Sequence, residues 1–216
     1  MSASSDQSTF TVMEAELAQA LLERNLEIVP IPIVSGTTAQ EASLHHFCCV
    51  CNEEFLDQYI ELVQVHSAFE DKSIGWVLRD AVTGKQSGVV IVSRPETAYA
   101  REFFKKNMIT FNSDQNYDKW IQVQILCVSD SMRTGEGALL LVYALWYVTS
   151  HFGWTQSFLN VASPAKNFKA MKFYDSMLYY PLDANIPQSR WNTNHMTLLE
   201  QSLHSIRLRA KTSSKQ

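Results

Sequence analysis

Two closely spaced glycines, Gly135 and Gly137, mark the stretch of the sequence with the clearest chemistry. They stand in the polar segment SDSMRTGEG, between an alternating apolar run at 121–128 and a continuous apolar run at 138–148. This order is typical of a strand, a loop and a helix. Glycine lets a ligand approach the backbone closely, and the first N–H groups of a helix lack intrahelical acceptors at the positive end of its dipole. The segment therefore predicts a binding site for a phosphate or pyrophosphate.

Asn167 and Tyr174 form the second candidate pair. Ser163 and Pro164 are suited to the N-cap and the first position of a helix, which the sequence predicts over about 165–177. Seven residues make two helical turns, so Asn167 and Tyr174 would share one face of that helix. Tyr174 could serve chemistry there, or it could be a core tyrosine with a hydrogen-bonded hydroxyl.

The remaining elements must position these segments. Pro30 and Pro32 confine the first strand to a sheet edge, and AVTGKQS is typical of a hairpin loop. Strands before, between and after helices predict an α/β or α+β domain around one mixed, partly antiparallel sheet. We expect helices at 13–24, 39–50, 52–66, 96–107 and 165–177, and strands at 26–34, 74–79, 88–94, 121–128, 156–162, 178–182 and 195–199.

Composition predicts one domain. The chain has 216 residues, of which 46% are hydrophobic and 19% charged, and no linker divides it. We expect a disordered N-terminus at 1–8, a single domain over 9–205 with a peripheral insertion at 95–117, and a basic tail at 206–216. That tail is either solvated or in contact with an acidic partner.

Charge and hydropathy limit the classes of partner and compartment. The net charge of −4 argues against a nucleic-acid binder. The polar start lacks the order of a signal peptide, and the apolar run at 138–148 is shorter than the roughly 20 residues that span a bilayer. We therefore expect a cytoplasmic protein, with its four cysteines reduced.

The order of these parts resembles the GNAT acyltransferase superfamily over about residues 26–199. The loop pattern of that family is Arg/Gln-x-x-Gly-x-Gly/Ala, and MRTGEG keeps both glycines. Met132 stands at the first position, however, with the arginine displaced by one to Arg133. Glu136 is a second departure, because a carboxylate repels a pyrophosphate.

The second family signature, Asn-x-x-Ala-x-x-Phe-Tyr, matches residues 167–174. Family members usually continue toward Gly-Phe, and this chain has Leu178-Tyr179 instead. Each motif is weak alone. Both in this order, about 30 residues apart, make the resemblance more specific.

The resemblance implies a GNAT-like mixed sheet of six to seven mostly antiparallel strands, flanked by helices, with acetyl-CoA between two splayed central parallel strands. Backbone groups near the end of the first central strand would bind the pantetheine arm, and amides of the glycine loop would bind the pyrophosphate. Tyr174 would protonate the departing thiolate, which suits the comparable ordinary pKa values of phenols and thiols. The implied cofactor-binding residues are Cys127, Val128, Arg133, Thr134, Gly135, Glu136, Gly137, Ala138 and Asn167.

No residue is assigned as the general base that an amine nucleophile needs. The polar face of the central strand offers Gln122 and Gln124, which cannot act as bases, and Asp130 is typical of a turn. The segment HHFCCVC at 45–51 could instead bind a metal. Cys and His are zinc ligands, and His45, Cys48 and Cys49 would share one face of a helix. No second ligand pair of suitable spacing follows, so we predict no metal.

The sequence thus predicts an acetyl-CoA-dependent N-acetyltransferase in which an amine attacks the thioester directly. The alternative is a catalytically degenerate GNAT-fold protein with a binding or structural role in an assembly, which Met132, Glu136 and the missing strand carboxylate favour. The expected acceptor is a small-molecule amine or an amine on a protein. Neither nucleic acid nor a membrane is expected as a partner, and a homodimer is left open.

Overall fold

The computed structural model of the protein describes residues 3–31, 73–93, 119–129, 135–161, 168–183 and 186–213. The helices expected at 39–50, 52–66 and 96–107 lie outside these residues, as does the whole of the expected insertion at 95–117. In chain order the described elements are α1 (Ala3–Leu22), β1 (Leu26–Pro30), β2 (Ser73–Asp80), β3 (Gln86–Ser93), β4 (Trp120–Val128), α5 (Glu136–Phe152), β5 (Gln156–Asn160), α6 (Phe168–Ser176), β6 (Tyr180–Asp183), β7 (Ile186–Asn192) and α7 (His195–Ser213).

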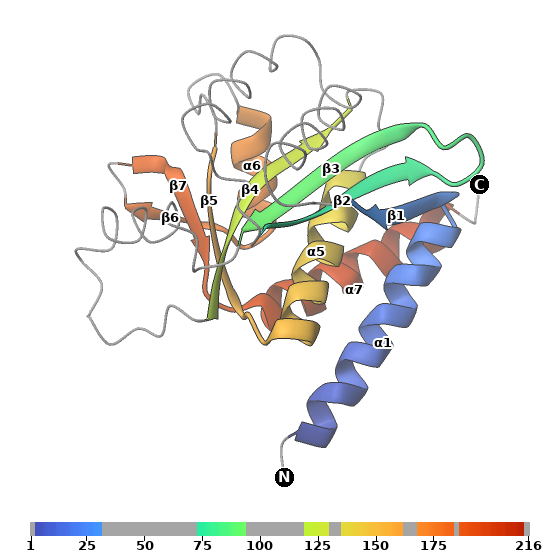
Figure 1. The fold of residues 1–216 in the computed structure, drawn as a ribbon, viewed down its shortest axis with the longest axis horizontal. Coiled ribbons are helices and arrows are strands. Elements are labelled where there is room, and N and C mark those ends of the chain that lie inside the picture. The colour runs from blue at the N-terminus through green and yellow to red at the C-terminus, as the bar shows by residue number, and fades with distance from the viewer. Residues whose placement is uncertain are drawn as a thin grey trace.

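The strands of the described residues form one seven-stranded sheet in the order β1-β2-β3-β4-β5-β7-β6 (Figure 1). β4 and β5 are parallel, and all other neighbouring strands are antiparallel. The expected fold class is therefore confirmed. Pro30 ends β1 at the sheet edge, where a missing backbone N–H costs no ladder hydrogen bond.

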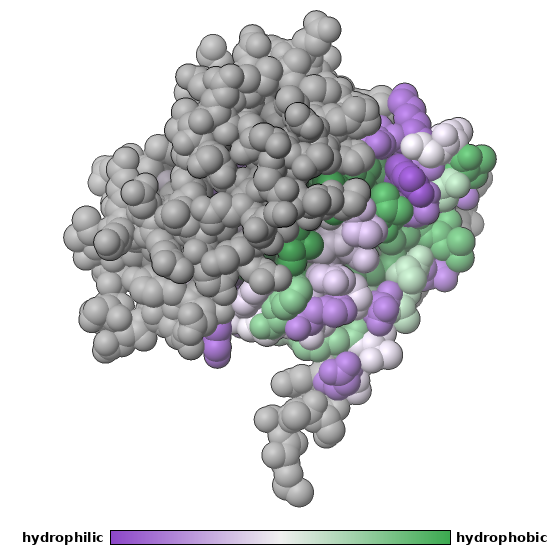
Figure 2. Space-filling model, in the orientation of Figure 1, coloured by the Kyte–Doolittle hydropathy of each residue, from purple (hydrophilic) through white to green (hydrophobic). Residues whose placement is uncertain are grey.

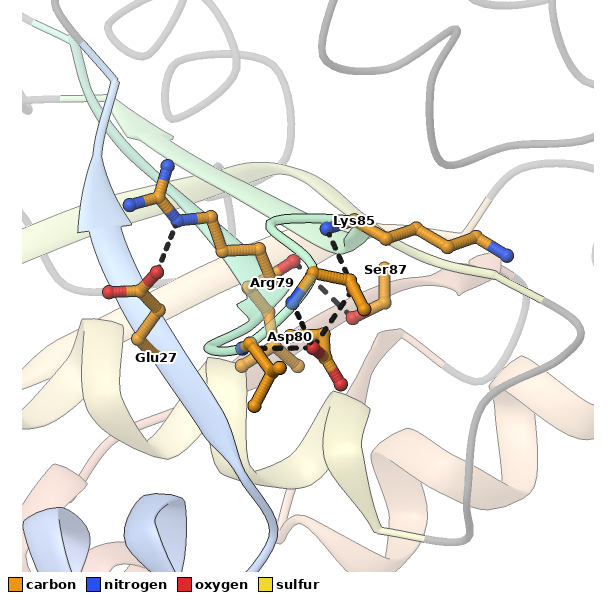
Figure 3. Close-up of polar contacts among 8 residues, drawn as sticks. Glu27, Arg79, Asp80, Lys85 and Ser87 are labelled. Carbon is orange, nitrogen blue, oxygen red and sulfur yellow. Dashed lines mark hydrogen bonds and ion pairs between the residues drawn. The ribbon is translucent and has the colours of Figure 1, made fainter.

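A tight turn joins β2 to β3 as the sequence predicted. Asp80 Oδ1 accepts hydrogen bonds from the backbone N–H groups of Val82 and Thr83 at 3.0 and 2.7 Å, and Gly84 adopts a φ of 69°. Figure 3 shows this turn and the neighbouring ion pair, in which Arg79 Nε donates to Glu27 Oε1 at 2.6 Å. The pair links β1 to β2, although its exposure keeps the electrostatic gain small.

α5 is the central helix of the domain. It lies against β2, β3 and β4 on one side and against α1 and α7 on the other (Figure 1). Burial on both sides explains why its sequence is apolar almost all round, with residues 139–142 fully buried. Among the helices of the described ranges, none is long and apolar enough to cross a membrane.

Three expectations differ from the structure. α1 begins at Ala3, so the disorder expected over 1–8 is wrong from residue 3 onward. Residues 195–199 start helix α7 rather than a strand, because the Asn194 side chain accepts a hydrogen bond from the backbone N–H of Thr197 at 3.2 Å and so caps the helix. The segment around Pro187, expected to be a loop, belongs to β7.

Candidate active site

The two parallel strands at the centre of the sheet pair over only a short stretch. Residues 120–122 of β4 align with residues 156–158 of β5. β4 then continues to Val128 and β5 to Asn160, but beyond this stretch the two strands no longer pair with each other. Figure 1 shows the two strands close together at their N-terminal ends and diverging at their carboxyl ends, with α6 beside the divergence. The sheet therefore opens at its centre, as the fold class required.

A bulge interrupts β4 where the strands separate. Ile91 of β3 pairs with Ile125, whereas the next residue, Val92, pairs with Val123, so Gln124 is the extra residue on β4. A bulge disrupts the ladder locally and re-aims backbone groups, and bulges are over-represented next to active sites. The last residues of β4 thus follow a local change of strand direction.

Gly135 and Gly137 lie at the start of α5 as expected. Gly135 is the N-cap residue, with φ 100° and ψ −3°, and no side chain caps the helix. The positive φ is a left-handed conformation that glycine adopts without strain. The first turn of α5 therefore presents backbone N–H groups that have no acceptor within the helix.

Gly137 marks the place where three elements meet. A Cβ atom at this position would lie 3.4 Å from Val128 Cγ1 at the end of β4 and 3.9 Å from Phe173 Cε2 of α6. The structure thus brings Val128, Gly135, Gly137 and α6 together. Phe173 was missed as a site residue, although it stands inside the second family signature, next to Tyr174.

Glu136 is the unusual residue of this helix start. Its side chain is only 5% exposed, and it stands in the first turn of α5. A carboxylate is favourable at this end of the helix because of the macrodipole. An anionic ligand on the same turn would lie close to this charge, so the concern raised by the sequence persists in the structure.

Only some of the other predicted cofactor-binding residues belong to the part of the chain that the structure describes. Ala138 is half-buried in the first turn of α5, whereas Arg133, Thr134 and Asn167 lie outside the described residues. Cys127 is disulfide-bonded, so the expectation of four reduced cysteines is wrong for this residue. Its predicted role uses the backbone of β4 and does not require a free thiol.

Two buried tyrosines, Tyr174 and Tyr179, lie side by side near this junction. Their ring centroids are 5.7 Å apart, with an interplanar angle of 72°. The Tyr179 hydroxyl shares a hydrogen bond of 2.6 Å with Ser157 Oγ of β5. The Tyr174 hydroxyl, by contrast, takes part in none of the hydrogen bonds found among the described residues, and it is not one of the buried side-chain atoms left without a partner there. Burial raises the pKa of the Tyr174 phenol well above its ordinary value of 10.0, so the phenol is protonated at neutral pH.

Solved structures share the fold of this chain. AtaTR bound with AcCoA matches 81% of this chain and 96% of its own, at 16% identity and a TM-score of 0.52. A Desulfovibrio desulfuricans protein of the GNAT family matches 77% of this chain and 94% of its own, at 11% identity and a TM-score of 0.46. The chain has the GNAT fold. AtaT complexed with acetyl-methionyl-tRNAfMet matches 78% of this chain and 94% of its own, at 17% identity and a TM-score of 0.47.

These likenesses concern the fold. At TM-scores below 0.5, the last two carry no argument about substrate or partner. No protein-family model and no curated protein matches the sequence.

Within this GNAT fold, the central strand offers an amide where a base would be useful. Gln122 is 4% exposed, and its Oε1 atom has no hydrogen-bond partner among the described residues. An amide oxygen can accept a hydrogen bond from a substrate, but it cannot take a proton at neutral pH. Gln122 can therefore orient a donor without activating it.

The part of the chain that the structure describes contains no candidate metal site. No three His, Cys, Asp or Glu side chains there come together in a way that could hold an ion. The candidates weighed from the sequence, His45, Cys48 and Cys49, lie outside these residues.

Proposed function

We propose that the protein is an acetyl-CoA-dependent N-acetyltransferase. The observation that carries this proposal is Tyr174, whose side chain is only 8% exposed and whose burial keeps the phenol protonated, on the helix beside the candidate anion site. The neighbouring Phe173 lies close to the start of α5, 3.9 Å from where a Cβ atom on Gly137 would be, so Tyr174 stands on a helix near the candidate anion site.

The co-substrate would lie where β4 and β5 separate. The pantetheine arm would follow the backbone of β4 near Cys127 and Val128. The pyrophosphate would bind the first turn of α5, where Gly135 and Gly137 present backbone without side chains. The full proposed set also includes Arg133, Thr134, Glu136, Ala138 and Asn167. That AtaTR, which shares the fold, binds AcCoA supports this assignment.

The chemistry is direct acyl transfer. A neutral amine attacks the thioester carbonyl carbon, the new C–N bond forms, and the C–S bond breaks. The Tyr174 O–H donates a hydrogen bond and then its proton to the departing CoA thiolate, while the nitrogen loses a proton toward solvent. The raised pKa keeps the phenol protonated at neutral pH, but it also makes proton transfer to a thiolate less favourable than the ordinary pKa values of phenols and thiols would. General acids in such positions contribute about 100-fold or more to the rate.

The amine loses its proton without help from an identified side chain. Gln122 cannot act as a base, and no carboxylate stands beside it on the described part of β4. We therefore propose that water removes the proton. The activity should rise with pH until the amine of the acceptor is neutral.

The acceptor is proposed to be a small-molecule amine or an amine on a protein. A net charge of −4 favours a cationic acceptor over an anionic one through long-range attraction. Absence of nucleic-acid and membrane partners, a cytoplasmic location and a homodimer remain predictions of the sequence.

The second candidate is a GNAT-fold protein that binds acetyl-CoA or a partner without turnover. Glu136 favours it, because a buried carboxylate at the start of α5 weakens the site for a pyrophosphate. The two candidates differ in thiol release from acetyl-CoA, which only the enzyme produces.

Calorimetric titration with acetyl-CoA tests the co-substrate site. We expect micromolar binding by the protein and its loss in Gly135→Glu, which places a carboxylate at the N-cap of α5. Gly153→Glu is the matched control, because Gly153 also has a positive φ but caps the opposite end of the same helix. Equal loss in both variants, or no binding by the unaltered protein, would overturn the proposed site.

A further inference from the structure

A second cleft lies between the N-terminal half of α1 and the C-terminal half of α5. It has a volume of about 350 Å³, which is within the range of small-molecule sites. Aromatic rings and polar groups share its lining, and Figure 2 shows hydrophilic and hydrophobic residues interspersed over this face. The lining residues are Gln7, Phe10, Thr11, Glu14, Tyr143, Trp146, Tyr147, Ser150 and His151.

The aromatic wall of the cleft is held in place by the core. Trp146 Nε1 donates a hydrogen bond to the backbone carbonyl of Phe10 at 3.2 Å, which fixes α1 against α5. Trp76 of β2 meets Tyr143 and Tyr147 edge-on, at centroid distances of 6.0 and 5.1 Å. The rings are therefore preorganised, which lowers the entropy cost of binding a ligand.

The cleft carries a carboxylate. Among the described residues that line it, Glu14 is the only acid, none is a lysine or arginine, and His151 is the one side chain that can become cationic. Burial is the main cause of a raised pKa at Tyr143, and both Tyr147 and the Glu14 carboxylate add to it. The negative field of Glu14 therefore reaches the aromatic wall. Aromatic faces beside a carboxylate attract a cation. One face of the Tyr147 ring is stacked on His151 at a centroid distance of 4.0 Å, so a cation would meet the other rings and the remaining surface of Tyr147.

The cleft is distinct from the proposed co-substrate site. It uses residues 143–151 of α5, whereas the co-substrate would bind residues 135–138 at the other end of the helix. Ten residues from Gly137 to Tyr147 correspond to about 15 Å of helix. Its second wall, α1, also lies outside residues 26–199, over which the sequence resembles acyltransferases.

We propose that this cleft binds a small organic ammonium ion, held by cation–π contacts with Tyr143, Trp146 and Tyr147 and by the charge of Glu14. Cation–π contacts recognise quaternary and primary ammonium groups in aromatic cages. The assignment does not depend on acetyl transfer, because it rests on a different part of the fold.

Choline and its neutral isostere 3,3-dimethylbutan-1-ol test the proposal by calorimetric titration at constant ionic strength. We expect choline to bind with a Kd in the roughly millimolar range and the alcohol at least about tenfold more weakly, because only the charge differs. Equal affinity for both compounds, or no heat with choline at about 50 mM, would overturn the cation site.

Variants locate the binding. Glu14→Gln and Tyr147→Leu should each weaken choline binding by about threefold or more. Glu23→Gln is the matched control, because Glu23 directly follows the same helix and accepts a hydrogen bond from Gln19 outside the cleft. An effect of Glu23→Gln equal to that of Glu14→Gln would place choline elsewhere and contradict the proposal. Addition of acetyl-CoA should leave the choline Kd unchanged.

Discussion

Tyr174 and Tyr179 lie with their ring centroids 5.7 Å apart, yet of their two hydroxyls only that of Tyr179 is seen to hydrogen-bond within the described residues, to Ser157 Oγ at 2.6 Å. Burial raises the pKa of both phenols, so both are protonated at neutral pH. The hydrogen bond to Ser157 gives the Tyr179 hydroxyl a structural role, since it joins the residue before β6 to β5. The Tyr174 hydroxyl is left available for a ligand, and this difference predicts opposite consequences for the two Tyr→Phe substitutions.

Tyr174→Phe should reduce turnover without destabilising the fold. Removal of an unbonded hydroxyl costs little stability, whereas loss of a general acid lowers kcat by about 100-fold or more. The dissociation constant for acetyl-CoA should stay unchanged. Steady-state kinetics and a thermal melt of the same preparation measure both effects.

Tyr179→Phe is the matched substitution in the neighbouring ring. It leaves the buried Ser157 hydroxyl without this partner, which costs about 1–3 kcal/mol. In a protein of this size each kcal/mol lowers Tm by roughly 2–4 °C. Turnover below the melting transition should persist. A normal kcat in Tyr174→Phe, together with an inactive Tyr179→Phe below its Tm, would show that Tyr179 and not Tyr174 is the general acid.

Glu136→Gln should tighten acetyl-CoA binding while slightly lowering stability. The substitution removes a repulsion between unit charges worth about 0.5–1 kcal/mol at 4–8 Å in water, or roughly a two- to fivefold lower Kd. It also removes a favourable carboxylate from the start of α5, worth about 0.3–1 kcal/mol of stability. Calorimetry should therefore show a higher affinity for acetyl-CoA, whereas thermal melting should show a lower stability. A weaker Kd in Glu136→Gln would show that the carboxylate supports the ligand.

His195 makes stability depend on pH. It is fully buried, its Nδ1 atom lies 3.0 Å from Thr149 Oγ1 and 3.1 Å from the Trp154 carbonyl, and burial lowers its pKa to about 3. Below the ordinary pKa of about 6.5, the unfolded chain binds a proton that the folded chain excludes. The free energy of unfolding should therefore fall by about 1.4 kcal/mol per pH unit from this group, between about pH 6.5 and 3.

Urea unfolding at several pH values isolates this contribution. His195→Gln removes the titrating group, so its stability should fall less steeply between pH 6.5 and 4.5 than that of the unaltered protein. His151→Gln serves as the control, because His151 is exposed at the end of α5. Parallel curves for the unaltered protein and His195→Gln would show that His195 is not kept neutral by the fold.

Much of the fold was predictable because local patterns agreed with it. The β2–β3 hairpin follows from its turn residues, the edge position of β1 follows from Pro30, and the burial of α5 follows from its apolar sequence. Residues 195–199 were assigned to a strand because five residues cannot distinguish the two periods. Burial of Leu198, Leu199, Leu203 and Ile206 shows the helical repeat only over the longer segment.

The candidate site was only partly predictable. The glycines and Tyr174 stand in local motifs, so their positions could be read from the chain. The bond from Tyr179 to Ser157 joins residues 22 positions apart, and the contact of Phe173 with Gly137 depends on how α6 packs against α5. Such pairings are set by the tertiary arrangement, which one sequence does not reveal. The different surroundings of the Tyr174 and Tyr179 hydroxyls could be recognised only in the structure.

Thiol release from acetyl-CoA, measured across a panel of primary amines with the unaltered protein and with Tyr174→Phe, tests the central claim most directly. The proposed mechanism predicts amine-dependent release of CoA by the unaltered protein, formation of the acetylated amine in equal amount, and about 100-fold or more slower release by the variant. Acetyl-CoA binding without thiol release from any amine on the panel would contradict the enzyme assignment and favour a GNAT-fold binding protein.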